Sequence, residues 1–195
     1  MTLQLTKKHS FDMVFDSQKV FRLVLEAMSN PVQVVNINEY ADKLYGDHPA
    51  LLAVAMTLLD NEVSFNACDN HSLTDEIASL TLAKKESIKA ADYIFISDLN
   101  YIEYAIEYAK CGTLADPHKS ATAIILNDGG SDCRVVLSGP GIDGKTDVSI
   151  TQTVKGAVTM RDAQCYEYPQ GIDFLFISGA GDLMAIPRLT RMEVH

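Results

Sequence analysis

Apolar residues in this chain come in short runs of strand length, and helix-length amphipathic segments separate those runs in the first half. Strands that alternate with helices are typical of an α/β fold. The second half instead places strand-like runs next to one another, which indicates antiparallel pairing. We therefore expect a single α/β domain over residues 1–195, built on a mixed sheet. The expected strands are 32–37, 63–67, 93–96, 121–126, 134–137, 174–177 and 183–186.

The first helix-like segment is 16–28, where apolar side chains recur three and four residues apart. This spacing predicts a helix whose apolar stripe packs against the core. Asp16 or Ser17 is expected to cap the first turn, and Asn30 before Pro31 ends the helix. The stripe consists of Val20, Phe21, Val24, Leu25 and Met28.

Four further segments have helical character. They are 49–59, 71–84, 101–110 and 154–164. The second of them is expected to be capped near Ser72 or Thr74. In the third, Tyr101, Tyr104 and Tyr108 fall at helical spacing. Such a stripe is more typical of a core or an interface than of a ligand site.

Two pairs of strand-like runs flank glycine-rich turns, which is the pattern of a β-hairpin. The first pair is 121–126 and 134–137, around the turn 127–132. The second pair is 174–177 and 183–186, around Gly179-Ala180-Gly181. Both pairs are predicted to form hairpins.

The formal net charge of −10 argues against a protein that binds nucleic acid through its own surface, because neutralising phosphates requires clustered lysines and arginines. A local basic pocket, or a site completed by a basic partner, remains compatible with this charge. No apolar run reaches the length of a membrane span, and the first residues do not resemble a signal peptide. We expect a cytoplasmic protein without a membrane partner.

Metal and cofactor chemistry find little support in the sequence. Cys68, Cys111, Cys133 and Cys165 lie far apart, so we expect buried, reduced thiols and no zinc site. The histidines form no ligand pair, and no metal is expected. No lysine is framed by the phosphate cup that pyridoxal phosphate needs, so no cofactor is expected. A serine nucleophile motif is also missing, and catalytic residues stay unknown.

Two glycine-rich stretches follow strands: Gly139-Pro140-Gly141 and Gly179-Ala180-Gly181. Neither has the third glycine and the following helix of a dinucleotide fingerprint, and neither matches a Walker A loop. The simpler interpretation is that both are turns. The alternative is a nest of backbone N–H groups that binds an anion, with Gly139 and Gly141 as ligand-binding candidates.

Asp173 and Arg188 bracket the final pair of strands, so a hairpin there brings them together. The simpler interpretation is an ion pair at a surface or an interface, worth about 0–1 kcal/mol. In the alternative, Arg188 binds a phosphate or a carboxylate through two parallel hydrogen bonds. Asp173 and Arg188 are therefore ligand-binding candidates.

Five stretches, in order along the chain, resemble the PhnH family, which supplies a subunit of the bacterial carbon–phosphorus lyase. FRLVLEAMSNP resembles the family's opening helix and stop, although Val32 replaces its next glycine. LSGPGI resembles its LTGAGI turn, and YPQGID followed by LMAIPRLT resembles its ending. These stretches are 21–31, 51–60, 137–142, 168–173 and 183–190.

The resemblance implies a fold similar to the large domain of pyridoxal-phosphate-dependent transferases, without the cofactor. It also implies a homodimer that assembles with PhnG-, PhnI- and PhnJ-like subunits. That assembly transfers an alkylphosphonate to the ribose C1 of ATP and releases adenine. The resemblance carries over no catalytic residue, so the chain is expected to be a non-catalytic or site-completing subunit. Contact with a nucleotide or a phosphonate is left open.

A different class of function stays open beside this one. The chain could act alone as an enzyme or a binding protein for a nucleotide or a sugar phosphate. It would then use one of the two glycine stretches as an anion nest near Arg188. A third reading is a structural dimer whose cleft no longer has a role.

Overall fold

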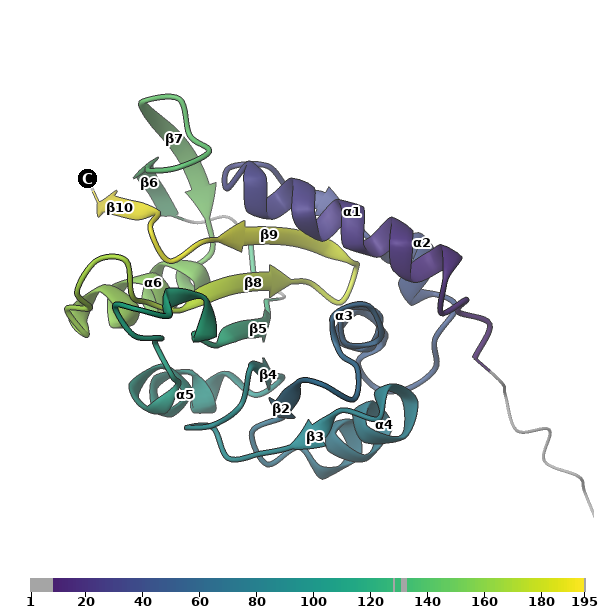
Figure 1. Ribbon diagram of the computed structural model, residues 1–195. Helices are drawn as coiled ribbons and strands as arrows, with labels where there is room; N and C mark the ends of the chain where they lie inside the picture. The colour runs from purple at the N-terminus through teal and green to yellow at the C-terminus, as the bar shows by residue number, and fades with distance from the viewer. Residues whose placement is uncertain (1–8, 128, 131–132, 195) are drawn as a thin grey trace, which may run out of the picture.

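The computed structural model describes residues 9–127, 129–130 and 133–194 (Figure 1). Its central sheet contains β1 (Val35–Asn36), β2 (Ser64–Asn66), β3 (Lys84–Lys85), β4 (Tyr93–Ile96), β5 (Thr122–Leu126), β8 (Asp173–Ile177) and β9 (Asp182–Ile186). The strand order is β1-β9-β8-β5-β4-β2-β3. The strands from β3 to β8 are parallel to one another, and β9 runs antiparallel between β8 and β1. The predicted α/β class with a mixed sheet is confirmed.

Helices cover both faces of this sheet. They are α1 (Phe15–Ser29), α2 (Asn38–Ala41), α3 (Pro49–Leu58), α4 (His71–Thr81), α5 (Ile102–Tyr108) and α6 (Gln152–Ala163), with 3-10 turns η1 (Leu99–Tyr101) and η2 (Pro117–Lys119). The buried residues of α1 to α4 form one apolar cluster with Phe95 of β4, whereas those of α5 and α6 join Ile94 and Ile96 in a second cluster. Successive side chains of β4 therefore point to opposite faces of the sheet and pack in two different helical layers. In the described residues, no helix combines the length and the apolar character that a membrane crossing needs.

A second, three-stranded sheet holds β6 (Cys133–Ser138), β7 (Lys145–Ile150) and β10 (Arg191–Val194) in the order β10-β6-β7. It lies at one end of the molecule, next to the C-terminus (Figure 1). The predicted hairpin between 121–126 and 134–137 is wrong, because both edges of β5 pair with β4 and β8 in the central sheet. β6 instead pairs with β7 across the loop 139–144. Residues 128, 131 and 132 of the expected turn lie outside the described residues.

The second predicted hairpin is confirmed, since β8 and β9 pair from Phe174 with Ile186 to Ile177 with Leu183. Gly181 turns the chain with a φ of +82°. A Cβ atom at Gly181 would lie 2.6 Å from the backbone nitrogen of Asn38, where α2 begins. Glycine is needed there both for the turn and for this close approach.

The helix predicted over 16–28 is confirmed. The helix predicted over 71–84 is confirmed only to Thr81, because Lys84 begins β3. The caps of both helices differ from the predicted ones. The Asp12 carboxylate accepts hydrogen bonds from the backbone N–H groups of Val14 and Phe15, both at 2.8 Å. Asn70 caps α4 by accepting from the N–H of Leu73 at 3.0 Å. In both cases the helix starts near the predicted place, and an earlier side chain satisfies its free N–H groups.

The apolar stripe of α1 is only partly buried. Val20 and Val24 are in the core, whereas Phe21 and Leu25 are 50% and 54% exposed. Val14 lies on the same outward side and is 69% exposed. α1 packs on α3 and β9 from one side only (Figure 1), so its apolar surface exceeds what this core covers. We call Val14, Phe21 and Leu25 the α1 outer stripe.

Asp16 ties α1 to the chain behind α2. Burial raises the pKa of Asp16, but the Asp12 N–H and the Lys43 ammonium, at 2.7 Å, outweigh burial and lower the pKa overall. The pKa of Asp16 in the folded protein therefore lies below its unfolded value of about 4. Ionised Asp16 stabilises the fold fully above that unfolded value, and this contribution is lost as the pH falls through the folded pKa.

The free energy of unfolding of Asp16→Asn should therefore fall less steeply than that of the wild type as the pH is lowered from 6 toward 3. Urea titrations of both proteins at a series of pH values would check this. Parallel curves would show that Asp16 is not part of the acid response.

Candidate functional site

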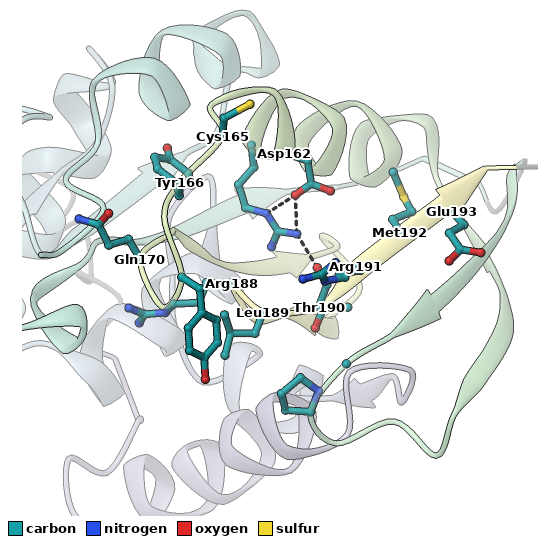
Figure 2. Close-up of a pocket in the computed structure, with 14 residues that line it drawn as sticks. Asp162, Cys165, Tyr166, Gln170, Arg188, Leu189, Thr190, Arg191, Met192 and Glu193 are labelled. Carbon is teal, nitrogen blue, oxygen red and sulfur yellow. Dashed lines mark hydrogen bonds and ion pairs between the residues drawn. The ribbon is translucent and has the colours of Figure 1, made fainter. Parts of the chain in front are cut away.

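A cleft of about 680 Å³ lies between the end of α6, the following loop and the chain that enters β10 (Figure 2). Asp162, Tyr166, Arg188 and Thr190 are arranged around it in the close-up. The lining residues are Gly139, Pro140, Arg161, Asp162, Cys165, Tyr166, Tyr168, Gln170, Arg188, Leu189, Thr190, Arg191, Met192 and Glu193. The volume falls in the range of small-molecule sites.

Arg188 lies in this cleft and is anchored by Asp173, the first residue of β8. One Asp173 oxygen accepts from the backbone N–H of Arg188 at 2.7 Å and from its Nε at 3.2 Å, and the other accepts from Nη2. Nη1 donates to the carbonyl of Pro117. The two side chains are 18% and 9% exposed, so the pair is mostly buried. The predicted proximity of Asp173 and Arg188 is confirmed, and their binding of a ligand stays a prediction.

Arg161 is a second anchored arginine, which our sequence analysis did not single out. It is 2% exposed, and its guanidinium lies 5.5 Å from the ring centre of Phe174. Its Nη1 donates to the carbonyl of Pro187 at 3.0 Å, and Nη2 donates to that of Thr190 at 2.7 Å. Arg161 therefore binds two carbonyls of the segment 187–190, and Arg188, which belongs to this segment, ties it to Asp173 and Pro117. We call this segment the arginine-held turn.

A signal for Arg161 was present in the sequence. The inward positions of α6 follow helical spacing, and the stripe of Val154, Ala157 and Val158 continues directly to Arg161. A charged residue on a buried stripe needs partners, because burying an unpaired charge is costly. The backbone carbonyls of the arginine-held turn provide those partners.

The remaining polar groups of the cleft include Tyr166 and Thr190. Burial raises the pKa of Tyr166 to about 12, and its hydroxyl donates to the carbonyl of Ile106 at 3.5 Å. Thr190 is 2% exposed, and its hydroxyl oxygen has no hydrogen-bond partner among the described residues. Arg188 uses only some of its N–H donors on protein atoms, so it can still donate into the cleft.

The two predicted glycine candidates of the loop after β6 have different surroundings. Gly139 lines the cleft, and a Cβ atom there would lie 2.7 Å from the carbonyl oxygen of Leu189. Gly141 is not among the lining residues, and its Cβ would lie 2.3 Å from the carbonyl oxygen of Ser29 at the end of α1. Close backbone packing explains both glycines without an anion, and anion binding at either stays a prediction.

Gly141 and Gly144 offer a matched pair of substitutions. Both have a positive φ, of +81° and +66°, but only at Gly141 would a Cβ atom meet backbone. Gly144→Ala should cost about 1–2 kcal/mol, or roughly 2–8 °C in melting temperature. Gly141→Ala should lower the melting temperature further, because Ser29 must move. Calorimetry of the two variants checks this, and equal shifts would contradict the close packing.

The described residues contain no group of three or more histidine, cysteine, aspartate or glutamate side chains placed to hold a metal ion. All four cysteines are free. Cys68 and Cys133 are buried as predicted, whereas Cys111 is half-buried and Cys165 is exposed at the cleft. The prediction of buried thiols is therefore wrong for Cys165, which follows the end of α6 on a loop.

The fold and the cleft define an α/β protein in which a buried arginine, Arg161, and a largely buried one, Arg188, donate hydrogen bonds to other parts of the same chain. The chain belongs to the PhnH family: the family model, described as bacterial phosphonate metabolism protein, matches residues 9–193. It is also similar to HtxG of Stutzerimonas stutzeri, a candidate C-P lyase subunit protein. The two are 25% identical over 178 residues, which cover 91% of this chain and 86% of HtxG.

Proposed function

We propose that this chain is a subunit of a carbon–phosphorus lyase complex that breaks down organic phosphonates. The observation that carries the proposal is the family match, which spans nearly all described residues. The similarity to HtxG along most of both chains supports it. Two of the stretches that resemble the family connect separate parts of the fold. Residues 137–142 pack on the end of α1, and residues 183–190 contain the arginine-held turn.

In the finer proposal, the complex transfers an alkylphosphonate to the ribose C1 of ATP with release of adenine. PhnG-, PhnI- and PhnJ-like chains are the partners, and this chain also forms a homodimer in the cytoplasm. Its own part is to support or complete the site rather than to carry the chemistry. The use of Arg161 and Arg188 as anchors favours a supporting role, because their guanidinium groups are engaged by backbone carbonyls and by Asp173.

The α1 outer stripe is our candidate contact for a partner subunit. Exposed aromatic and aliphatic side chains at helical spacing are typical of a helix that docks in an apolar groove. Phe21 and Leu25 are four residues apart, so they present one continuous apolar ridge. The net charge of −10 would favour a partner of more basic character.

A second candidate role is binding of an anion, such as a nucleotide or a phosphonate, in the cleft. The remaining donors of Arg188 and the neighbouring Arg191 supply positive charge, and Gly139 also lines the cleft, next to Leu189. Asp173 would act behind Arg188 by fixing its orientation. Similarity of the whole fold to pyridoxal-phosphate-dependent transferases is part of the proposal, and the mixed seven-stranded sheet is compatible with it.

Growth on a phosphonate tests the proposed function. A bacterium without its own PhnH-family gene should fail to grow on methylphosphonate as sole phosphorus source, and a plasmid carrying this chain should restore growth when the other subunits are compatible. Growth on inorganic phosphate is the control. Failure to restore growth in the strain that originally encodes this chain would contradict the proposal.

A further inference from the structure

A second hollow, of about 550 Å³, opens on the carboxyl side of the parallel strands. Its lining comes from the chain that directly follows three neighbouring strands. The end of β2 contributes Asn66, Cys68 and Asp69. The chain after β3 contributes Ser87, Ile88 and Lys89, and the chain after β4 contributes Asn100, Tyr101 and Tyr104. We call it the strand-end crevice. It is separate from the cleft around Arg188, with which it shares no lining residue.

The topology of the sheet explains why a crevice forms here. β2 and β4 are parallel neighbours. The chain leaves β2 through α4, which packs in the first apolar layer, and leaves β4 through α5, which packs in the second. Two adjacent strands thus send their connections to opposite faces of the sheet. In open α/β sheets, ligands bind outside the carboxyl ends of the strands at this kind of reversal.

A fixed carboxylate lies in the crevice. The Tyr101 hydroxyl donates to one oxygen of Asp69 at 3.1 Å, and this hydrogen bond raises the pKa of Tyr101. The other Asp69 oxygen accepts no hydrogen bond from the described residues, so it is available to hydroxyl groups of a ligand. Cys68 and Asp69 both have positive φ values, of 44° and 59°. Consecutive non-glycine residues in this conformation are uncommon, and such strain gathers at binding sites.

Aromatic surface lies beside that carboxylate. Tyr104 is 51% exposed, and its ring centre is 4.7 Å from that of Tyr108. Of the tyrosines at helical spacing, Tyr101 packs against the second apolar cluster, whereas Tyr104 is exposed and is not a core residue. Lys89 holds its ammonium 4.7 Å from the ring centre of Tyr108. It is the single cation among the crevice's lining residues, and Asp69 is the single anion.

We propose that the strand-end crevice binds a nucleoside or a nucleoside monophosphate. The base stacks on the exposed tyrosine ring, since any base offers a flat face to an aromatic side chain. The ribose hydroxyls donate to Asp69, as they do to the acidic residue of dinucleotide-binding folds. The amide of Asn100 and the hydroxyl of Ser87 form no side-chain hydrogen bond with the described residues, and they are available to the base edge. The crevice has one cation, Lys89, so it fits the single phosphate of a nucleoside monophosphate better than a triphosphate.

The proposal concerns this chain alone and does not rest on the proposed function in the complex. Calorimetric titration of the full-length chain with adenosine should give saturable binding with one site. AMP should bind several-fold more tightly than adenosine, and Lys89→Ala should remove that difference. Backbone amide signals of residues 66–69 and 100–104 should shift in an NMR titration with the same ligands.

Two variants locate the site. Tyr104→Ala and Asp69→Asn should each weaken adenosine binding about tenfold, because stacking and the carboxylate each supply a main contact. Both side chains are exposed, so the variants should unfold at the wild-type urea midpoint. Tyr168→Ala, at the other cleft, is the matched control. No heat at millimolar adenosine or AMP, or a loss of binding only in Tyr168→Ala, would overturn the proposal.

Discussion

Asp173→Ala is expected to lower the free energy of unfolding by about 3–5 kcal/mol, the typical cost of removing one partner from a buried ion pair. The change leaves the Arg188 backbone N–H and two guanidinium nitrogens without their acceptor. Arg188 is only 18% exposed at its side chain, so water replaces the carboxylate poorly. Urea unfolding followed by circular dichroism measures the loss.

Asp162→Ala is the matched control for this prediction. Asp162 also pairs with a buried arginine, at 3.0 Å from Arg161, but its side chain is 47% exposed. We expect it to cost less than Asp173→Ala, because Asp162 is itself half exposed and Arg161 keeps the carbonyls of Pro187 and Thr190 as acceptors. The double variant Asp173→Ala with Arg188→Ala should lose less than the sum of its single changes, since no charge is then left unpaired. Equal losses for Asp173→Ala and Asp162→Ala would contradict the anchoring role.

Phe21→Asp together with Leu25→Asp is expected to abolish association with the other subunits of the complex. If the α1 outer stripe is buried in the interface, each change places a charge in an apolar contact and costs about 2 kcal/mol or more of binding. The fold should be unaffected, because both side chains are half exposed. Co-purification of the tagged variant from cells that express the whole complex measures the effect.

Leu82→Asp supplies the control, since Leu82 is 75% exposed and lies just past the end of α4. It makes the same chemical change away from α1 and should leave co-purification intact. A stripe variant that still co-purifies at the wild-type level would contradict the docking assignment. A variant that instead changes only from dimer to monomer would assign the stripe to the homodimer rather than to a partner subunit.

The local periodicity of the sequence was sufficient to predict most elements of this fold. The runs at β4 and β8 are apolar on both faces because parallel strands lie between two helical layers. The pairing of β5 was not predictable in the same way, since the glycine-rich turn after it suggested a hairpin, while tertiary packing placed β5 between β4 and β8. Local turn signals say little about partners that are distant in sequence.

At the cleft too, contacts set by local pairing could be predicted, whereas contacts set by tertiary packing could not. The proximity of Asp173 and Arg188 followed from one hairpin register, so it could be predicted. The partners of Arg161 lie 26 and 29 residues further along the chain, and their carbonyls carry no side-chain signal. The exposure of Phe21 and Leu25 could not be predicted either, because apolar spacing alone does not tell how wide a stripe of the helix the core will cover.

Affinity purification of the tagged full-length chain, from cells growing on methylphosphonate, tests the central claim most directly. The account predicts that the PhnG-, PhnI- and PhnJ-like subunits are recovered with it in fixed stoichiometry and elute as one large assembly. A chain that elutes alone or as a simple homodimer, while those subunits form their complex without it, would contradict the account.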